Sequence, residues 1–255
     1  AGRAAALMTV AALSLGAGGA DASSKTMKPP LHAKQWLAIT GKPLGATAGA
    51  MVFQRGGNAV DAACAMIAAT ATMWDVLHWG GETQALIYNP HTREVIGVNA
   101  LGVAPAGATV EFFRAQGLRY PPEHGPQAAV TPGTPGGILL MLAEYGRLSL
   151  AEVLAPAIDL ADGYPIEQET ASLIERHAER LRQWPDTRRV MLPNDGEPPQ
   201  AGQIFRQPEL AATLRKLVAA EQAALEAGAD RKAAIMAAYE RFYRGDIAAE
   251  IARAT

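Results

Sequence analysis

A corner at Gly56-Gly57-Asn58 constrains the fold more than any other feature of the sequence. Two segments with the apolar spacing of helices meet there, one starting after Pro43 and one ending near Met73. Glycine supplies the left-handed backbone of a helix C-terminus, and asparagine is a strong N-cap. Alanine, which makes up 53 of the 255 residues, lets such helices pack closely. We therefore expect two tightly packed helices, the first with an inner face of Ala48, Met51 and Val52.

Strands are predicted at three places. Residues 34–39 have the composition of a strand, and residues 84–88 and 94–99 are short enough apart, across residues 89–93, to form a hairpin. These strands are too few to complete a large sheet alone. The expected fold class is therefore α+β, rich in helix.

More helices are predicted in the second half of the chain. One covers residues 138–145, and another follows a capping box of Ser149 and Glu152 and ends at Gly163. Beyond Glu167 the pattern is almost entirely helical. Two amphipathic helices there carry apolar stripes, Leu210, Leu214, Leu217 and Val218 on one and Ile235, Met236, Tyr239 and Phe242 on the other.

The charge and cysteine content exclude several classes of function. The formal net charge is −2, and no run of lysine or arginine offers a footprint for a phosphate backbone, so no nucleic-acid partner is expected. A single cysteine, Cys64, excludes an internal disulfide and a multi-thiolate metal site, and we predict that it is a buried packing residue. The five histidines have no metal-binding spacing, and the five serines include no nucleophile elbow. No metal and no cofactor is expected.

The N-terminal residues 1–33 read as an export-signal remnant followed by a linker. Arg3 precedes an apolar stretch over residues 4–15, and small residues then lead to a cleavage-like site at residues 20–23. This pattern predicts a periplasmic or secreted protein. The alternatives are an alanine-rich helix of the folded domain and a cytoplasmic protein.

The segment from Asp75 to Thr83 has the composition of a binding loop. Gly80 and Gly81 let the backbone approach a ligand with its amide N–H groups free to donate, and His78 and Glu82 offer proton-transfer or hydrogen-bonding groups. A tight turn with a hydrogen-bonded histidine is the alternative. Asn99, at a strand end, either orients a ligand or caps a turn.

Several segments together resemble the gamma-glutamyltransferase family, whose hallmark is similar to residues 55–63 (RGGNAVDAA). The others follow in the same order as in that family. They are Gly80-Gly81 before a strand, residues 104–109 (APAGAT), 130–137 (VTPGTPGG), Tyr145-Gly146, 154–158 (LAPAI), 163–166 (GYPI) and 242–248 (FYRGDIA).

This resemblance implies an N-terminal nucleophile hydrolase with an αββα sandwich that a partner small subunit completes. Such enzymes cut their own precursor and expose a threonine whose amine serves as general base. They cleave a small-molecule amide and pass the acyl group to water or to an amine. Residues 34–255 then correspond to the N-terminal part of the large subunit, and Thr255 is not the nucleophile. A dimer of such heterodimers is compatible with the resemblance.

One departure from the family concerns the substrate. Glutamyl-specific members carry an arginine, four residues before the proline of the APAGAT-like segment, that binds the substrate α-carboxylate. Counting back from Pro105 leads to Leu101. Loss of such a charge-assisted contact removes about 1.5–3 kcal/mol of binding. The family's run of four glycines is also reduced to Gly80-Gly81, and Glu82, if it faces the pocket, would repel a carboxylate.

The resemblance and the departure together lead to an expected site and three hypotheses. The residues expected on the substrate side are His78, Trp79, Gly80, Gly81, Glu82, Asn99 and Leu101, with Trp79 favoured as a packing residue. Asn58 and Asp61 are assigned to structure.

The favoured hypothesis is an amidase or acyltransferase whose acyl group is not a standard γ-glutamyl group. The second is a true gamma-glutamyltransferase or glutathione hydrolase, with the carboxylate held by Arg93 or Arg114. The third is an unprocessed relative that works as a binding or structural protein.

Overall fold

The computed structural model describes residues 30–74 and 77–254. The segment predicted as an export-signal remnant, together with most of its linker, lies outside the described residues, as do Asp75, Val76 and Thr255. The contacts of the chain separate residues 1–35 from residues 36–255, and the second unit is the one that carries the helices and strands. None of its described helices is long and apolar enough to cross a membrane.

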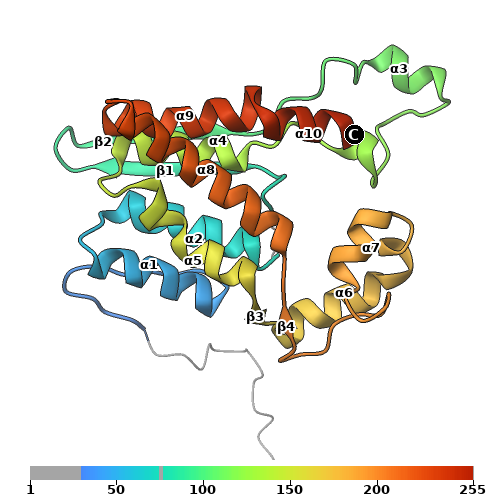
Figure 1. The fold of residues 1–255 in the computed structure, drawn as a ribbon, viewed down its shortest axis with the longest axis horizontal. Coiled ribbons are helices and arrows are strands. Elements are labelled where there is room, and N and C mark those ends of the chain that lie inside the picture. The colour runs from blue at the N-terminus through green and yellow to red at the C-terminus, as the bar shows by residue number, and fades with distance from the viewer. Residues whose placement is uncertain (1–29, 75–76, 255) are drawn as a thin grey trace, which may run out of the picture. The chain divides into compact units, whose positions relative to one another are not determined.

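The elements of this unit confirm the α+β class (Figure 1). The helices are α1 (Pro43–Gln54), α2 (Ala59–Thr72), α3 (Val110–Ala115), α4 (Thr134–Tyr145), α5 (Leu150–Asp162), α6 (Gln168–Leu181), α7 (Pro185–Met191), α8 (Pro208–Glu226), α9 (Arg231–Arg244) and α10 (Asp246–Ala254), with a 3₁₀ turn, η1, at Pro126–Ala128. The strands are β1 (Thr83–Asn89), β2 (Glu94–Ala100), β3 (Tyr164–Pro165) and β4 (Ile204–Phe205).

The corner between α1 and α2 forms as predicted. Gly56 has a φ of +88°, and the Asn58 side chain accepts hydrogen bonds from the N–H groups of Val60 and Asp61. The buried Asp61 carboxylate accepts in return from the Asn58 N–H at 2.8 Å and also from the N–H groups of Arg147 and Leu148. The structural role predicted for Asn58 and Asp61 is confirmed, because this carboxylate joins the start of α2 to the loop after α4.

The inner face of α1 differs from the prediction at one position. Met51 is 37% exposed, whereas Gly45, Ala48, Gly49 and Val52 are buried. A Cβ atom added at Gly49 would lie 2.7 Å from the side chain of Met66 on α2. Gly49 therefore leaves room on α1 for the Met66 side chain of α2, and Met51 lies outside this contact.

The predicted hairpin is confirmed as an antiparallel pair, β1 and β2, with Thr83 opposite Ala100 and Asn89 opposite Glu94. One face packs on α4 and contributes Ala85, Ile87 and Val98 to the main core. The opposite face exposes large apolar side chains: Leu86 is 81%, Tyr88 62% and Val95 63% exposed. A helix layer thus covers one side of the hairpin, as one half of an αββα sandwich requires, and in the described residues the other side is open.

The strand predicted at residues 34–39 is wrong. These residues have no regular secondary structure, and no described strand lies beside them to pair with their backbone groups. Trp36 instead stacks on Phe53 of α1, with ring centroids 4.9 Å apart. Composition indicated a strand here, but a strand also requires a hydrogen-bonding neighbour.

The main core lies among α2, α4, α5, α8 and α9: α8 packs on the next helix, α9, and the pairs α2 with α5, α5 with α8 and α4 with α9 are distant in sequence. The predicted stripes are largely confirmed, since Leu214, Leu217 and Ile235 are buried. Cys64 is fully buried, its Sγ lies 3.6 Å from the Ile138 carbonyl oxygen, and burial raises the pKa of its thiol. It is therefore the packing residue that we predicted.

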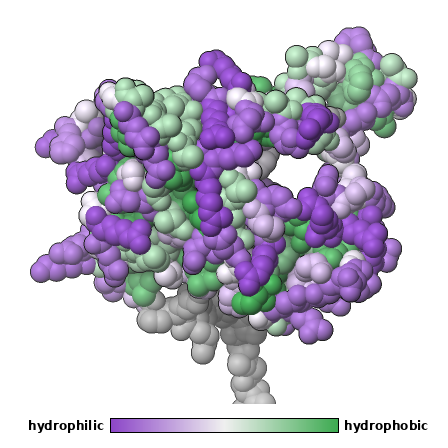
Figure 2. Space-filling view, viewed as in Figure 1, coloured by the Kyte–Doolittle hydropathy of each residue, from purple (hydrophilic) through white to green (hydrophobic). Residues whose placement is uncertain are grey.

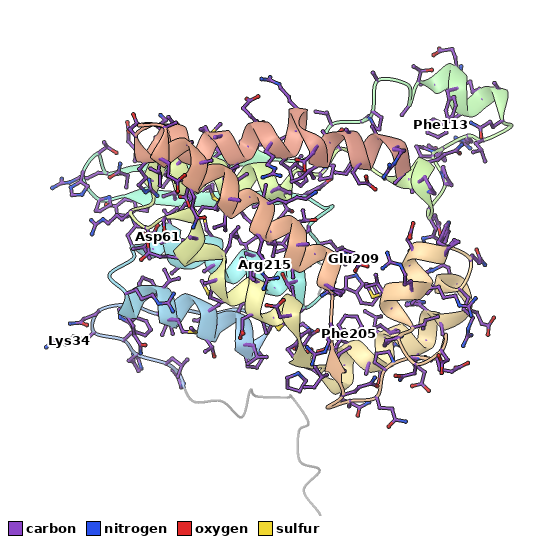
Figure 3. The ribbon with its side chains drawn as sticks, in the orientation of Figure 1. Lys34, Asp61, Phe113, Phe205, Glu209 and Arg215 are labelled. Atoms are coloured by element: carbon purple, nitrogen blue, oxygen red, sulfur yellow. The ribbon has the colours of Figure 1, made fainter. Side chains whose placement is uncertain are left out.

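A second, smaller core lies around β3, β4 and α6. The rings of Tyr164 and Phe205 meet edge to face, with centroids 6.3 Å apart, and Ile174 of α6 is fully buried in the same cluster. Figure 3 marks the position of Phe205. Polar side chains dominate the surface over α6 and α7 (Figure 2). Met73, which follows α2, belongs to this second core and joins it to the rest of the unit.

Candidate active site

A cavity of about 310 Å³ lies at the end of the hairpin where β2 finishes. Three segments that are distant in sequence form its walls: residues 99–103, the turn at residues 131–137 with the first part of α4, and α9. The lining residues are Asn99, Ala100, Leu101, Gly102, Val103, Thr131, Pro132, Gly133, Gly136, Gly137, Leu140, Tyr239 and Tyr243.

The turn at residues 131–137 lies against the hairpin more closely than side chains would allow. A Cβ atom at Gly133 would lie 2.1 Å from the Ala100 carbonyl oxygen, and one at Gly102 would lie 1.9 Å from the Thr131 carbonyl oxygen. Both distances are well below van der Waals contact, so these positions require glycine. The glycines of this turn therefore set how the cavity wall approaches the strand end.

Backbone hydrogen bonds hold the turn in place. The N–H groups of Gly133 and Thr134 donate to the Gly81 carbonyl oxygen at 2.8 and 3.0 Å, and the Thr131 N–H donates to the Val103 carbonyl oxygen at 3.0 Å. The loop before β1 and the segment after β2 are thus joined to the same turn. The Gly81 carbonyl group thus holds in place the turn that forms one wall of the cavity.

Tyr243 of α9 fixes the turn from the other side. Its hydroxyl donates to the Pro132 carbonyl oxygen at 2.5 Å and accepts from the Gly136 N–H at 3.0 Å. Burial raises the pKa of Tyr243, so the hydroxyl keeps the proton that it donates. The ring of Tyr239 lies beside it, with centroids 4.6 Å apart. Two tyrosines one helical turn apart therefore form one wall.

Of the residues predicted on the substrate side, Asn99 and Leu101 line the cavity, and His78, Trp79, Gly80, Gly81 and Glu82 do not. The Trp79 Nε1 donates to the Thr72 hydroxyl at 3.0 Å, in agreement with a packing role. The expectation of free amide donors in this loop is wrong for Gly81, because its N–H donates to the His78 carbonyl oxygen at 3.0 Å. A tight turn is what this loop forms.

The turn-capping alternative for Asn99 is confirmed. Its Oδ1 accepts from the Leu101 N–H at 3.1 Å, which caps the turn after β2, and the residue is among those that line the cavity. Glu82 is exposed and takes no part in the cavity wall. This geometry therefore does not support the expected repulsion between Glu82 and a carboxylate in the cavity.

No charged side chain is among the described residues that line the cavity. Arg93 lies at the opposite end of the hairpin from Leu101, about 26 Å away for eight residues of extended chain. Arg114 lies on α3, which Figure 3 marks by Phe113 and which stands apart from the hairpin. Neither arginine that we considered as a substitute for the missing carboxylate ligand is in the cavity wall.

Sequence reasoning missed much of the cavity: Thr131, Pro132, Gly133, Gly136, Gly137, Leu140, Tyr239 and Tyr243. The sequence does carry a signal for this turn, because the turn has more glycines than the start of a helix requires. Tyr239 was assigned to a core stripe because helical spacing does not distinguish a core from a cavity wall. Nowhere in residues 30–74 and 77–254 do three His, Cys, Asp or Glu side chains gather as metal ligands would.

Comparisons with known proteins match this chain to one family. A model of the family described as Gamma-glutamyltranspeptidase matches residues 45–255. The glutathione hydrolase proenzyme of Bacillus subtilis is 32% identical over 189 residues, which cover 71% of this chain and 32% of that protein. The acylase ACY 1 proenzyme of Pseudomonas sp. strain SE83 is 32% identical over 207 residues, which cover 76% of this chain and 36% of that protein.

A solved structure agrees with these matches. The crystal structure of Helicobacter pylori gamma-glutamyltranspeptidase superposes with a TM-score of 0.76 at 30% identity, over 89% of this chain and 61% of that one. This chain spans about a third of the length of the two curated relatives.

Proposed function

Because this chain belongs to the gamma-glutamyltranspeptidase family, we propose that it is the front part of an amide hydrolase or acyltransferase. In this proposal the nucleophile is a threonine at the N-terminus of a second chain, which is cut from the same precursor. Two of the relatives are named as proenzymes, and the chain matches only about a third of their length. The proenzyme names support a division of the enzyme into two parts.

The open face of the hairpin supports a second chain that packs there. Leu86, Tyr88 and Val95 expose apolar surface side by side, on strands that are otherwise well ordered by α4. A contiguous apolar patch of this kind marks an interaction surface. The remaining sheet of the αββα sandwich is the occupant that the proposal assigns to it.

The reaction follows from the proposed nucleophile. The threonine hydroxyl attacks the acyl carbonyl carbon, its own amine takes the proton, and the C–N bond breaks as the leaving amine accepts that proton. Water, or an acceptor amine, then attacks the resulting ester and releases the acyl group. The residues of this chain bind and orient the acyl group, while Tyr243 and the glycines hold the wall in position.

The substrate is proposed to carry an acyl group other than standard γ-glutamyl. The single observation that carries this conclusion is Leu101, which occupies the arginine position of glutamyl-specific members and lies in a cavity wall without a charged side chain. Without the charge-assisted pair, recognition of an α-carboxylate loses about 1.5–3 kcal/mol. A true glutathione hydrolase would need a cation from outside the described residues.

Hydrolysis of γ-glutamyl-p-nitroanilide by the complete, co-expressed protein tests this function. We expect kcat/KM to be about 10- to 100-fold below that of glutamyl-specific members of the family measured alongside. An equal rate would establish a true gamma-glutamyltransferase and overturn the proposed substrate class. Complete inactivity on every amide, with an uncut precursor, would favour a binding or structural protein.

A further inference from the structure

We infer that the acyl group of the substrate is uncharged and largely apolar, and that Leu101 and Leu140 form its binding wall. This inference rests on the proposed function, since it assigns the substrate class of the same cavity. It goes beyond the absence of a carboxylate ligand because it says what the cavity binds instead.

Three large apolar side chains in the cavity wall are open to solvent: Leu101 is 41%, Val103 69% and Leu140 41% exposed. Leu140 is informative because its neighbours on α4, Leu139 and Met141, are fully buried. Leu140 therefore lies in the cavity wall, whereas its two neighbours on α4 are covered by the core. Exposed apolar side chains that converge on one hollow are typical of a small-molecule site with an apolar ligand.

The polar groups of the cavity are neutral. The Asn99 Oδ1 is occupied by the Leu101 N–H, and in the described part of the chain its Nδ2 has no hydrogen-bond partner. The Tyr239 hydroxyl, likewise, has no partner among the described residues. A neutral amide or a hydroxyl can orient a carbonyl, ether or hydroxyl oxygen. Neither can compensate a carboxylate or an ammonium group for the loss of its hydration.

The volume agrees with a small acyl group. A cavity of about 310 Å³ lies at the lower end of the range for small-molecule sites. Gly133, Gly136 and Gly137 also line the cavity, and they are buried against Ala100 and Tyr243. A linear or aromatic acyl chain can fit this volume, with its apolar surface against Leu101 and Leu140.

The experiment compares three amides that share a leaving group, hexanoyl-, glutaryl- and γ-glutamyl-p-nitroanilide, with the complete protein. We expect kcat/KM for the hexanoyl amide to exceed both others by about tenfold or more. The Leu101→Arg variant should shift the ratio of γ-glutamyl to hexanoyl activity upward by about 10- to 100-fold, because it adds a cation to the wall. The Leu140→Asn variant should lower hexanoyl activity about tenfold and lower the γ-glutamyl rate by a smaller factor.

Leu225→Arg is the matched control, since Leu225 is 43% exposed but lies at the end of α8 and outside the cavity. If either wall variant folds poorly, competitive inhibition of the wild-type protein by hexanoate against glutarate measures the same preference. Faster cleavage of the glutaryl or γ-glutamyl amide would overturn this inference and leave the amidase function intact. Wall variants that behave like Leu225→Arg would show that another segment of the protein covers the leucines, which also overturns it. Failure on all three amides with an uncut precursor would refute the function and the inference together.

Discussion

Tyr243 is the residue on which the shape of the cavity most depends, because a single hydroxyl satisfies two backbone groups of the turn at residues 131–137. It donates to the Pro132 carbonyl oxygen and accepts from the Gly136 N–H. Two groups of the chain that are more than a hundred residues apart in sequence are thereby fixed together. The Tyr243 side chain therefore both packs against the turn and positions the cavity wall.

Replacement of Tyr243 by phenylalanine should lower the free energy of unfolding of the complete protein by about 1–3 kcal/mol, since the Gly136 N–H loses its partner. It should also raise KM more than it lowers kcat, because the wall moves while the proposed nucleophile is untouched. Urea unfolding and steady-state kinetics measure the two effects. Tyr145→Phe is the control, as the Tyr145 hydroxyl has no hydrogen bond among the described residues. Equal effects of the two variants would contradict the positioning role.

Because of Tyr164, the free energy of unfolding should fall as the pH rises into the alkaline range. Burial raises the pKa of its hydroxyl, which donates to the Met73 carbonyl oxygen at 3.0 Å. The folded state therefore keeps a proton that the unfolded chain loses above its ordinary pKa of about 10. What the protonated Tyr164 hydroxyl adds to the free energy of unfolding is present below that pH and is lost as the pH rises beyond it.

In the wild-type protein this residue should lower the free energy of unfolding by up to about 1.4 kcal/mol per pH unit above pH 10. Tyr164→Phe should show a shallower decline. Chemical denaturation at pH 8, 10 and 11 measures the slopes, and Tyr120→Phe, at a residue that is 67% exposed, should keep the wild-type slope. The same slope in all three proteins would exclude an elevated pKa at Tyr164.

At the scale of elements, a carboxylate from α8 caps the start of α5. Glu221 is 1% exposed, and its two oxygens accept from the Leu150 N–H at 2.6 Å and the Ala151 N–H at 3.1 Å. These donors have no partner within their own helix, and the negative charge also suits the positive end of the helix dipole. The contact joins two helices of the main core.

Glu221→Ala should destabilise the complete protein by about 2–3 kcal/mol, because it leaves two N–H groups without a partner and removes a charged acceptor. Thermal and urea unfolding measure this loss. Glu226→Ala changes the same residue type on the same helix at an exposed position and should cost less than 0.5 kcal/mol. If Glu221→Ala cost as little as Glu226→Ala, water would have replaced the carboxylate as the cap of α5.

Local signals predicted the elements well and their surroundings poorly. The caps at Asn58 and Ser149 were read correctly because each is complete within four residues. Residues 34–39 and Met51 were misjudged because their state depends on neighbours that are distant in sequence. The cavity follows the same rule. Asn99 is indicated by its position at a strand end and Leu101 by the family resemblance, whereas Tyr239 becomes a wall residue only where α9 meets the turn.

At the scale of the whole molecule, the open face of the hairpin is where we propose that the second chain packs. Leu86→Asp places a charge on that face and should lower the free energy of unfolding of the complete protein by about 2–3 kcal/mol, together with the yield of paired chains. Native mass spectrometry measures the pairing. Leu225→Asp is the control, since that leucine lies on α8 and far in sequence from the hairpin. An equal response at both positions would mean that the hairpin face stays in solvent.

The intact mass of the complete natural protein, purified without added protease, tests the central claim most directly. If this chain is the front part of a self-cleaving amide hydrolase, the spectrum contains two polypeptides, and the smaller one begins with threonine. A single uncut polypeptide that nevertheless hydrolyses acyl amides would contradict the account, because the attacking hydroxyl would then belong to an undivided chain.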